Sequence, residues 1–415
     1  MTRLTSTESS GGGKVRFAHV SDLHIGGVTE PGLKRRENQA VQQFVDSCLE
    51  EKVEFIVISG DLFDTNIPPM PQAVMVAQEF RRLKESGARI YTIYGSHDFS
   101  PTHHSLIEVL EADGLLRVIS EPVQDESGVW LNGIHGLAGA KEVSAFRNFS
   151  EKLALTGTGN KRSVFAFHTA LLEANMVRQE QAIPVSLLPR GYSYYAAGHL
   201  HERIEFKSLE GAPVNYPGPL FLGWGAGDLE RYFKEGATGF YIVEIDEEGR
   251  ATFEYKPVRA ISGCLLEIGA EGADAREFAA HVSEQLSQTA QKYGRGSLIM
   301  LKLTGELRAG RRETVTVAIE KVKKRYPDID FKVNDRALTD PEEVVVEQGE
   351  DLEERAFQKL AKMFPGEVSS DFILKLVESL GTEKQPGESR ADYNSRILAE
   401  VDQLLSEKLG DSVKT

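Results

Sequence analysis

Cysteine is almost absent from this chain of 415 residues, which has Cys48 and Cys264 alone and far apart. Two cysteines without a C-x-x-C spacing give little support to a disulfide framework or a thiolate zinc site, so we expect two reduced thiols. Long apolar runs are also missing, and the polar start "MTRLTSTESSGGGK" has no apolar centre. We therefore expect neither a membrane span nor a signal peptide, and a cytoplasmic location.

A basic overall charge is the third absence, since the formal net charge is −15. That charge is unevenly spread. Residues 340–415 hold 18 acidic and 9 basic residues, whereas residues 294–336 hold 11 basic and 6 acidic residues. The basic segment could face phosphates and the acidic tail could not, although solvated helix faces are the plainer explanation of both runs.

Apolar runs of strand length alternate with helical patterns through the first half of the chain. The strands are expected at 14–20, 53–59, 88–94, 162–168 and 192–199, and helices at 35–52 and 71–87. Such a strand-helix-strand series predicts an α/β fold with a sheet layered between helices. The carboxyl ends of its strands are where a sheet of this kind usually places its site.

A second unit begins near residue 260. The patterns predict strands at 261–270, 296–307 and 330–335 with helices at 273–294 and 312–327, a small α/β module without a cluster of catalytic residue types. Two amphipathic helical segments follow in the acidic tail, around the linker "EKQPGES". Their apolar stripes either fold back onto the tail's own domain or dock in a partner's groove. The stripe residues are Phe372, Ile373, Leu376, Leu380, Ile397, Val401 and Leu404.

Carboxylates and histidines gather directly after the predicted strands. The five clusters are Asp22 and His24, then Asp61, then His97 and Asp98, then His168, and finally His199 and His201. Half of the ten histidines of the chain fall in these clusters, while His19 lies inside the first strand. One Asp-x-His would prove nothing, but five clusters in this order at strand ends indicate one site.

Carboxylate and imidazole ligands suit a pair of divalent cations such as manganese, iron or zinc. An aspartate oxygen can bridge two ions about 3.5–4 Å apart, and the ions together hold a phosphate, activate a water and neutralise charge on the attacking and departing oxygens. The residues therefore predict phosphoester hydrolysis.

The order D-x-H, G-D, G-N-H-D, H and G-H-x-H resembles the signature of the calcineurin-like metallophosphoesterase superfamily. "GDLFDTNIPPMPQAV", "YGSHDF", "HTALLEA", "YAAGHLHER", "NYPGPLFLG" and "GFYIVEID" resemble the SbcD family of DNA repair nucleases more closely. The resemblance implies an α/β fold, with a four-layer metallophosphoesterase β-sandwich flanked by helices, a small α/β capping domain and a helical C-terminal tail. The expected boundaries are 1–13 for a disordered N-terminus, 14–260 for the nuclease domain, 261–338 for the DNA-binding capping domain and 339–415 for the acidic linker with ATPase-binding helices.

The resemblance also implies residue roles. Asp22, His24 and His201 would hold the first metal, Asp61 would bridge, and His168 and His199 would hold the second metal. Mn²⁺ is the expected ion at both sites. His97 would be the acid that protonates the leaving 3′ oxygen or stabilises the phosphate, and Asp98 would orient its imidazole. His19 is expected to be a core group or to support the ligands from behind.

Two positions depart from the family pattern. Asp64 stands where archaeal relatives have a helper histidine, which resembles the bacterial branch. Ser96 stands where the family has asparagine, whose amide oxygen is a ligand of the second metal. Because a serine hydroxyl is shorter and a weaker donor, we expect Ser96 to lower occupancy of the second metal site.

Substrate and partners follow from the same resemblance. We expect a metal-dependent exo- and endonuclease that acts on DNA ends and hairpins, works with an SbcC-type coiled-coil ATPase, and forms a homodimer through apolar positions of 72–83 and 102–111. Phosphate contacts without base readout are expected from the basic module. Its candidate residues are Arg308, Arg311, Arg312, Lys321, Lys323, Lys324 and Arg325.

Two other functions stay open. The same kind of site serves many substrates, so the chain could hydrolyse nucleotides or another small phosphodiester. Alternatively, the second metal is lost through Ser96 and the chain is a DNA-end tether that scaffolds the ATPase.

Overall fold

A computed structural model describes residues 13–98, 105–137, 143–144, 146, 161–174, 176, 181–207, 211–236, 238–340, 375, 393, 396–399 and 403. The chain divides into two compact units, Met1–Asp340 and Pro341–Thr415. The first unit contains two six-stranded sheets and, further along the chain, a three-stranded sheet with its helices.

The first sheet has the strand order β14-β13-β1-β2-β3-β4. Its strands are β1 (Val15–Val20), β2 (Phe55–Ser59), β3 (Arg89–Ile93), β4 (Arg117–Val118), β13 (Thr238–Ile245) and β14 (Ala251–Val258). β1 to β4 run parallel, while β13 pairs antiparallel with β1 and β14 antiparallel with β13. The helices between the parallel strands are α1 (Pro31–Glu50), α2 (Met70–Glu85) and α3 (Leu106–Ala112).

The second sheet has the order β11-β12-β10-β7-β6-β5. Its strands are β5 (Val123–Gln124), β6 (Trp130–Ile134), β7 (Ser163–His168), β10 (Tyr194–Gly198), β11 (Ile204–Lys207) and β12 (Pro213–Tyr216). The short elements β8 (Ala170–Leu171), η1 (Leu172–Ala174), β9 (Ala182–Ile183) and η3 (Val185–Leu187) lie between β7 and β10 along the chain. The four central strands are parallel.

The two sheets pack face to face, as alternate residues of β2 reveal. Phe55 and Val57 join a core with Val164 and Tyr194 of the second sheet. Ile56 and Ile58 point the other way, into a core with residues of α1 and α2. The four-layer β-sandwich is thus confirmed, whereas the single sheet between helices that the strand-helix alternation predicted is wrong, because one face of this sheet meets a second sheet.

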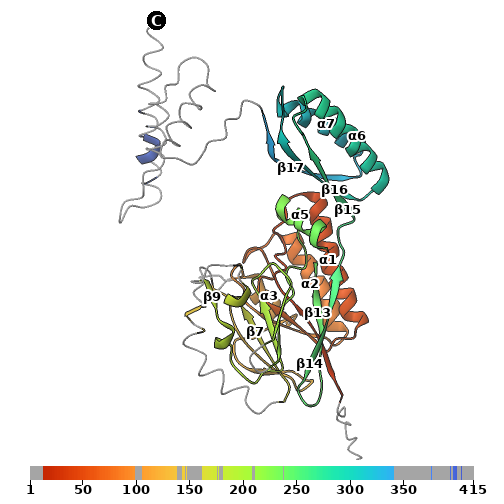
Figure 1. The fold of residues 1–415 in the computed structure, drawn as a ribbon. Coiled ribbons are helices and arrows are strands. Elements are labelled where there is room, and N and C mark those ends of the chain that lie inside the picture. The colour runs from red at the N-terminus through yellow and green to blue at the C-terminus, as the bar shows by residue number, and fades with distance from the viewer. Residues whose placement is uncertain are drawn as a thin grey trace, which may run out of the picture. The chain divides into compact units, whose positions relative to one another are not determined.

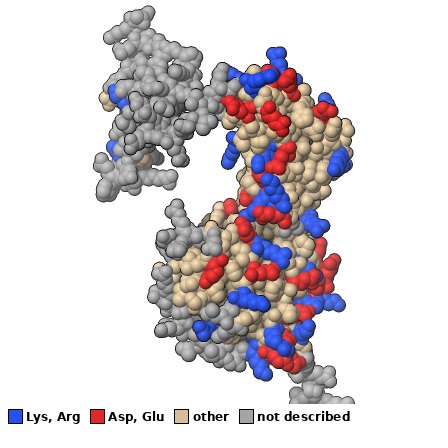
Figure 2. Space-filling view, in the orientation of Figure 1, with Lys and Arg blue, Asp and Glu red and all other residues tan. Residues whose placement is uncertain are grey.

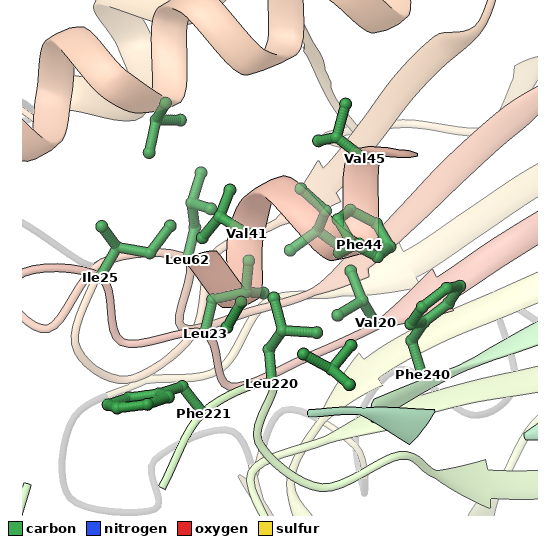
Figure 3. Close-up of a cluster of buried hydrophobic side chains, with 14 of the residues drawn as sticks. Val20, Leu23, Ile25, Val41, Phe44, Val45, Leu62, Leu220, Phe221 and Phe240 are labelled. Atoms are coloured by element: carbon green, nitrogen blue, oxygen red, sulfur yellow. The ribbon is translucent and has the colours of Figure 1, made fainter. Parts of the chain in front are cut away.

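The outer core also anchors the loops that follow the strands. Val41, Phe44 and Val45 of α1 share one cluster with Leu23 and Leu62, which sit beside the candidate ligands in sequence (Figure 3). Leu23 and Leu62 are at most 1% exposed. Burying a leucine side chain stabilises by roughly 1.5–3 kcal/mol. These two side chains therefore hold the loops whose adjacent polar residues face away from the core.

The capping module, residues 263–339, is the small α/β unit that the sequence predicted. Its sheet has the order β15-β16-β17, with β15 (Gly263–Gly269), β16 (Leu298–Glu306) and β17 (Asp330–Thr339) all parallel. α6 (Ala275–Tyr293) and α7 (Arg312–Arg325) pack on this sheet (Figure 1). Asp274 caps α6 by accepting from the backbone N–H of Arg276, and Gly294 ends it with a φ of +73°.

The other face of the capping sheet meets the core beside the first six-stranded sheet. Leu298 and Met300 of β16 belong to the same buried cluster as Leu229 and Tyr232 of α5 (Ala226–Glu235). Lys302 adds an ion pair to Glu230 of α5. The module is therefore seated on α5 by apolar burial and charge together.

Most of the acidic tail lies outside the described residues, including the helical tail expected there. Of the stripe residues, Phe372, Ile373, Leu376, Leu380, Val401 and Leu404 lie outside them. Ile397 is described; it lies in a helical stretch, residues 396–399, and is only 8% exposed. None of the helices in the described ranges is long and apolar enough to cross a membrane.

His19 gives the fold a pH-dependent contribution. Its side chain is fully buried between the sheets, and its Nδ1 lies 2.9 Å from the Tyr194 hydroxyl. Burial lowers the pKa of His19 from 6.5 to about 3. Between these values the unfolded chain binds one more proton than the folded chain, so this contribution is complete above pH 6.5 and falls by about 1.4 kcal/mol per unit as the pH drops toward 3.

Replacing His19 with glutamine should flatten the dependence of unfolding free energy on pH by that slope. Urea unfolding of both proteins in steps between pH 6.5 and 4.5 measures it. Parallel curves for the two proteins would show that His19 titrates normally in the folded state.

Candidate metal centre

The carboxyl ends of four central strands meet at one edge of the sandwich. Asp22 follows β1, Asp61 follows β2, His168 ends β7, and the loop after β10 carries His201. His24 completes the set, which we call the metal centre. Its ligand atoms form two groups, each with all atoms within 4.8 Å of one another: Asp22 with His24 and His201, and Asp22 with Asp61 and His168.

Backbone strain concentrates at the same loops. Among the described residues other than glycine, six have a positive φ, and four of these are Asp22, His24, Asp61 and His199. A residue with a Cβ in this region costs roughly 1–3 kcal/mol, which persists where the surroundings enforce it. Strain of this kind clusters at functional sites, so the observation supports one here independently of the side chains.

In the first group, two imidazoles point their Nε2 atoms at each other. His24 Nε2 lies 3.1 Å from His201 Nε2 and 3.5 Å from Asp61 Oδ2. The other ring nitrogen of His24, Nδ1, lies 3.4 Å from the Asp64 carboxylate. A proton held on Nδ1 by that carboxylate leaves Nε2 as a lone pair, so the two facing nitrogens need a cation or a further proton between them.

In the second group, His168 presents a lone pair to a carboxylate. Its Nδ1 lies 2.8 Å from the Ser59 carbonyl oxygen, which can only accept, so Nδ1 carries the proton. Its Nε2 is buried without a hydrogen-bond partner and lies 3.1 Å from Asp61 Oδ2. Asp61 Oδ2 thus lies close to one imidazole of each group, as a bridging carboxylate must.

The pKa values of the ligand residues are shifted by burial and by the charges of neighbouring groups. Burial alone would lower the pKa of His168, but the charge of Asp61 overrides burial and raises it to about 10. Burial raises the pKa of Asp22 to about 6, partly opposed by His168. Burial lowers the pKa of His201 to about 3 and that of His199 to about 4. Without a cation, a proton on His168 takes the place that positive charge must fill.

These donors fit a pair of divalent cations. Two buried carboxylates and three imidazoles converge with more lone pairs than protons, and imidazole with carboxylate suits Mn²⁺, iron or zinc. Such ions, when bound, supply the positive charge that polarises a phosphoester and stabilises its departing oxygen. The protein holds the ligands from behind, through the Ser59 carbonyl oxygen on His168 and the Asp64 carboxylate on His24.

His97 lies beside this centre, but Asp98 does not orient it. Asp98 is buried, and its carboxylate accepts from the backbone N–H groups of Leu62, Phe63 and Gly95. The Nδ1 of His97 meets the carbonyl oxygen of Asp64 instead, at 2.8 Å. The predicted contact between the Asp98 carboxylate and the His97 imidazole is therefore wrong; Asp98 ties the loops after β2 and β3 together.

Ser96 and His199 stand differently from the other candidates. The Ser96 hydroxyl donates to Asp61 Oδ2 at 3.3 Å, so it contacts the carboxylate that faces both groups. His199 lies in neither ligand group; its ring packs against His168, with centroids 5.1 Å apart, and its backbone N–H donates to Asp22 at 3.1 Å. As the structure stands, His199 supports the centre through Asp22.

Two neighbours of the centre escaped the sequence reasoning. Asp64, which the sequence indicates only as a replacement for a helper histidine, contacts His24 and forms a third group with His24 and His97. The indole of Trp224 packs edge-on against His24 and at a tilt against His201, with centroids 4.9 and 5.1 Å apart. The spacing of "GDLFD" could have indicated Asp64; nothing in "FLGWG" indicated Trp224.

The candidate DNA-binding residues gather on one helix of the capping module. Arg312, Lys321, Lys323, Lys324 and Arg325 belong to α7, with Arg311 just before it and Arg308 in the preceding loop. Several already have acidic neighbours. Arg312 lies 3.7 Å from Asp340, Lys323 pairs with Glu320, and Arg308 lies 3.9 Å from Glu277. On the face drawn in Figure 2, basic and acidic side chains are interspersed.

Comparison with known proteins identifies the class. Residues 15–203 match the family "Calcineurin-like phosphoesterase". These residues are similar to calcineurin-like metallophosphoesterase domains, the class that the sandwich and its two ligand groups also indicate.

The chain resembles DNA double-strand break repair protein Mre11 in particular. The protein of that name from Sulfurisphaera tokodaii is 32% identical over 230 residues, which cover 54% of this chain and 58% of that protein. The one from Archaeoglobus fulgidus is 26% identical over 391 residues, which cover 88% of this chain and 84% of that protein. A solved structure, a dimetal phosphatase from Danio rerio, covers 58% of this chain and 98% of its own at 11% identity, with a TM-score of 0.38. The match to the Sulfurisphaera tokodaii protein covers less than two thirds of the length of that protein.

Proposed function

We propose that the chain is a metal-dependent DNA nuclease that processes DNA ends and hairpins together with an SbcC-type ATPase. The observation that carries the proposal is the convergence of ligand atoms at the metal centre, where His24 Nε2 faces His201 Nε2 and the buried His168 Nε2, without a hydrogen-bond partner, faces Asp61, in a chain similar to Mre11 proteins. Both contacts call for positive charge at the point where a phosphoester would be held.

In this proposal Asp22, His24 and His201 hold one ion, His168 and Asp22 contribute to the other, and Asp61 faces both. His97 acts on the leaving oxygen. Its Nδ1–H is held by the Asp64 carbonyl oxygen, so the ring is fixed, and a second proton, carried on Nε2 in the imidazolium form, is the one that His97 would donate to the leaving oxygen. The side chain of His97 is 47% exposed, in contrast to the buried ligands, as a group that meets a large substrate requires. Mn²⁺ is our proposal for both ions.

DNA phosphates would be held by the basic residues of α7 and its preceding loop. Those without a carboxylate neighbour are the better candidates, because phosphate binding then breaks no existing ion pair. Such binding would weaken steeply with salt.

The test of the nuclease is degradation of end-labelled linear duplex DNA in Mn²⁺, with the Ser96→Asn protein beside the natural chain. The asparagine side chain is longer than that of serine, and its amide oxygen can reach the second ion, whereas the Ser96 hydroxyl donates to Asp61. The Ser96→Asn protein should therefore bind the second ion at least about tenfold more tightly and should digest DNA faster. Isothermal titration with Mn²⁺ measures the affinity.

Ser287→Asn on α6, whose hydroxyl donates to the Ser283 carbonyl oxygen, makes the same chemical change far along the chain and should leave both quantities unchanged. Digestion that appears only on addition of the ATPase would show that the partner is required. Digestion of a small phosphodiester but never of DNA would overturn the nuclease proposal.

The tether is a second candidate because of one observation. The Ser96 hydroxyl donates to Asp61 Oδ2 at 3.3 Å, and its oxygen is a shorter and weaker metal ligand than the amide oxygen of the asparagine that the family pattern has there. If the natural chain binds one Mn²⁺ and DNA without cutting it, while Ser96→Asn restores two ions and cleavage, the chain is a DNA-end tether.

We also propose a homodimer through an exposed apolar patch beside the site. The patch holds Ile67, Met70, Val74 and Val109, which are 50–73% exposed. A backbone bond from Leu106 to the Asn66 carbonyl oxygen joins its two segments. Exposed apolar side chains grouped in this way mark an interaction surface.

Val109→Glu should therefore weaken self-association by about 100-fold, because it places a charge on the apolar surface that the proposed dimer would bury. Sedimentation velocity over a range of concentrations measures the association. Val317→Glu on α7, where the side chain is 55% exposed, is the matched control and should leave it unchanged. Equal association of both variants would place the interface elsewhere.

A further inference from the structure

A polar cleft lies on the outer side of α1, where the helix meets the capping module. It has a volume of about 510 Å³. None of the residues of the metal centre lines it. Its polar lining includes Arg35, Arg36, Gln43, Asp46, Arg259 and Ser262.

One stripe of α1 forms the floor of this cleft. Its six lining residues recur at helical spacing from Arg35 to Asp46. The opposite stripe, which includes Val41 and Phe44, is buried in the core (Figure 3). The direction of the guanidinium and amide side chains is therefore set by the burial of the other face.

The cleft has more positive charge than its carboxylates neutralise. Arg36 is only 4% exposed, and its guanidinium donates to the carbonyl oxygens of Gly32 and Gly296 and to Asp330. Arg35 reaches the same carboxylate at 3.4 Å, so one aspartate serves two arginines. The only acidic lining residue, Asp46, is already paired with Arg82 at 2.6 Å.

Arg259 is the uncompensated cation of the set. It is exposed, follows β14, and makes no ion pair with any residue in the described ranges. Its backbone is fixed by Gln43, which accepts from the Arg259 N–H at 3.0 Å. The position of Arg259 at the rim is thus held while its guanidinium remains available.

The walls of the cleft are fixed relative to each other. The bond from Arg36 to the Gly296 carbonyl oxygen spans the cleft, and Lys332 of β17 pairs with Glu30 just before α1. A binding site whose donors are already held loses less entropy when a ligand binds. The two sides of the cleft are therefore held in a fixed position by side-chain contacts.

We propose that this cleft binds the phosphate groups of a nucleic acid backbone. Guanidinium and glutamine amide groups, with a serine, are donors that proteins use for phosphate oxygens without reading sequence. The inference rests on the proposed function, since it takes DNA as the substrate, and it adds a backbone contact away from both the metal centre and α7. A free nucleotide or inorganic phosphate carries the same chemistry, and the test separates these sources.

The test uses Arg35→Gln and Arg259→Gln together in the full chain. Glutamine removes the charge and keeps an amide hydrogen-bonding group on a shorter side chain. Anisotropy of a labelled 20-base-pair duplex, in EDTA and over a range of salt, should show affinity at least tenfold weaker and a log-log salt slope shallower by about 2. Hydrolysis of bis(p-nitrophenyl) phosphate in Mn²⁺ should be unchanged, because that substrate needs only the metal centre.

Arg250→Gln is the matched control, a paired surface arginine of the β13–β14 hairpin that is 76% exposed. Its duplex affinity should stay within twofold of the natural chain. If the double variant also stays within twofold, with the natural slope, the inference is overturned while the nuclease proposal stands. If the natural chain does not bind duplex at all, both fall. If adenosine monophosphate or phosphate raises the melting temperature of the natural chain but not of the variant, and duplex affinity is unaffected, the ligand is the small phosphate and the backbone assignment fails.

Discussion

Asp61→Asn is expected to lower phosphodiester hydrolysis by on the order of 10³-fold, the upper range for loss of one charge-stabilising group at an active site. The Oδ2 atom of Asp61 lies 3.1 Å from His168 Nε2 and 3.5 Å from His24 Nε2, so it serves both ligand groups. Asparagine puts a neutral oxygen or an N–H₂ donor in its place, and a donor repels a cation. Hydrolysis of bis(p-nitrophenyl) phosphate in saturating Mn²⁺ measures the loss.

A second readout separates this effect from misfolding. In the metal-free protein, the charge of Asp61 raises the pKa of His168 to about 10 against the opposing effect of burial. In the Asp61→Asn protein burial should prevail, and NMR titration should find the His168 pKa below its ordinary value. Asp46→Asn, which removes a surface partner of Arg82, is the control and should change neither the rate nor this pKa. Two tightly bound ions and full activity in Asp61→Asn would refute a bridging role.

The strand-helix alternation predicted the elements of the first sheet but not its packing partner. β1, β2 and β3 and the helices between them follow from local apolar periodicity. The sandwich depends on β13, which pairs with β1 from more than two hundred residues away, and on alternate β2 residues that face Tyr194 rather than a helix. A buried strand reads as apolar on both faces whichever layer covers it, so only the family resemblance indicated two sheets.

The candidate site was predictable to the extent that its residues follow strand ends. Asp22, Asp61 and His168 come together because central parallel strands end at one edge. Ring orientation was not predictable, because it depends on carbonyl and carboxylate groups fixed only by the tertiary fold. Asp98 is an example. It is next to His97 in sequence, but its carboxylate accepts from three backbone N–H groups, and the His97 imidazole contacts the carbonyl oxygen of Asp64 instead.

The orientation of the His168 ring also depends on the backbone at Gly60, where there is no room for a side chain. Gly60 precedes Asp61, and its φ is +87°. A Cβ there would lie 2.4 Å from His168 Nδ1 and 2.8 Å from the Gly95 Cα, both far inside contact distance. The alanine methyl would displace His168 from the Ser59 carbonyl oxygen that fixes its proton, so a glycine with no side chain controls the second ligand group.

Gly60→Ala should therefore lower hydrolysis by about 10²-fold or more, since small displacements at a reacting centre cost that much, and weaken Mn²⁺ binding with it. Gly87→Ala is the matched control: its φ is +91°, but a Cβ there would meet nothing within 4 Å. It carries the backbone penalty alone, about 1–2 kcal/mol of unfolding free energy, with activity unchanged. Urea unfolding and Mn²⁺ titration of both variants separate the two effects. Equal losses of stability and full activity in both would mean that the chain relaxes around His168, and that the imidazole is not held as rigidly as its buried contacts imply.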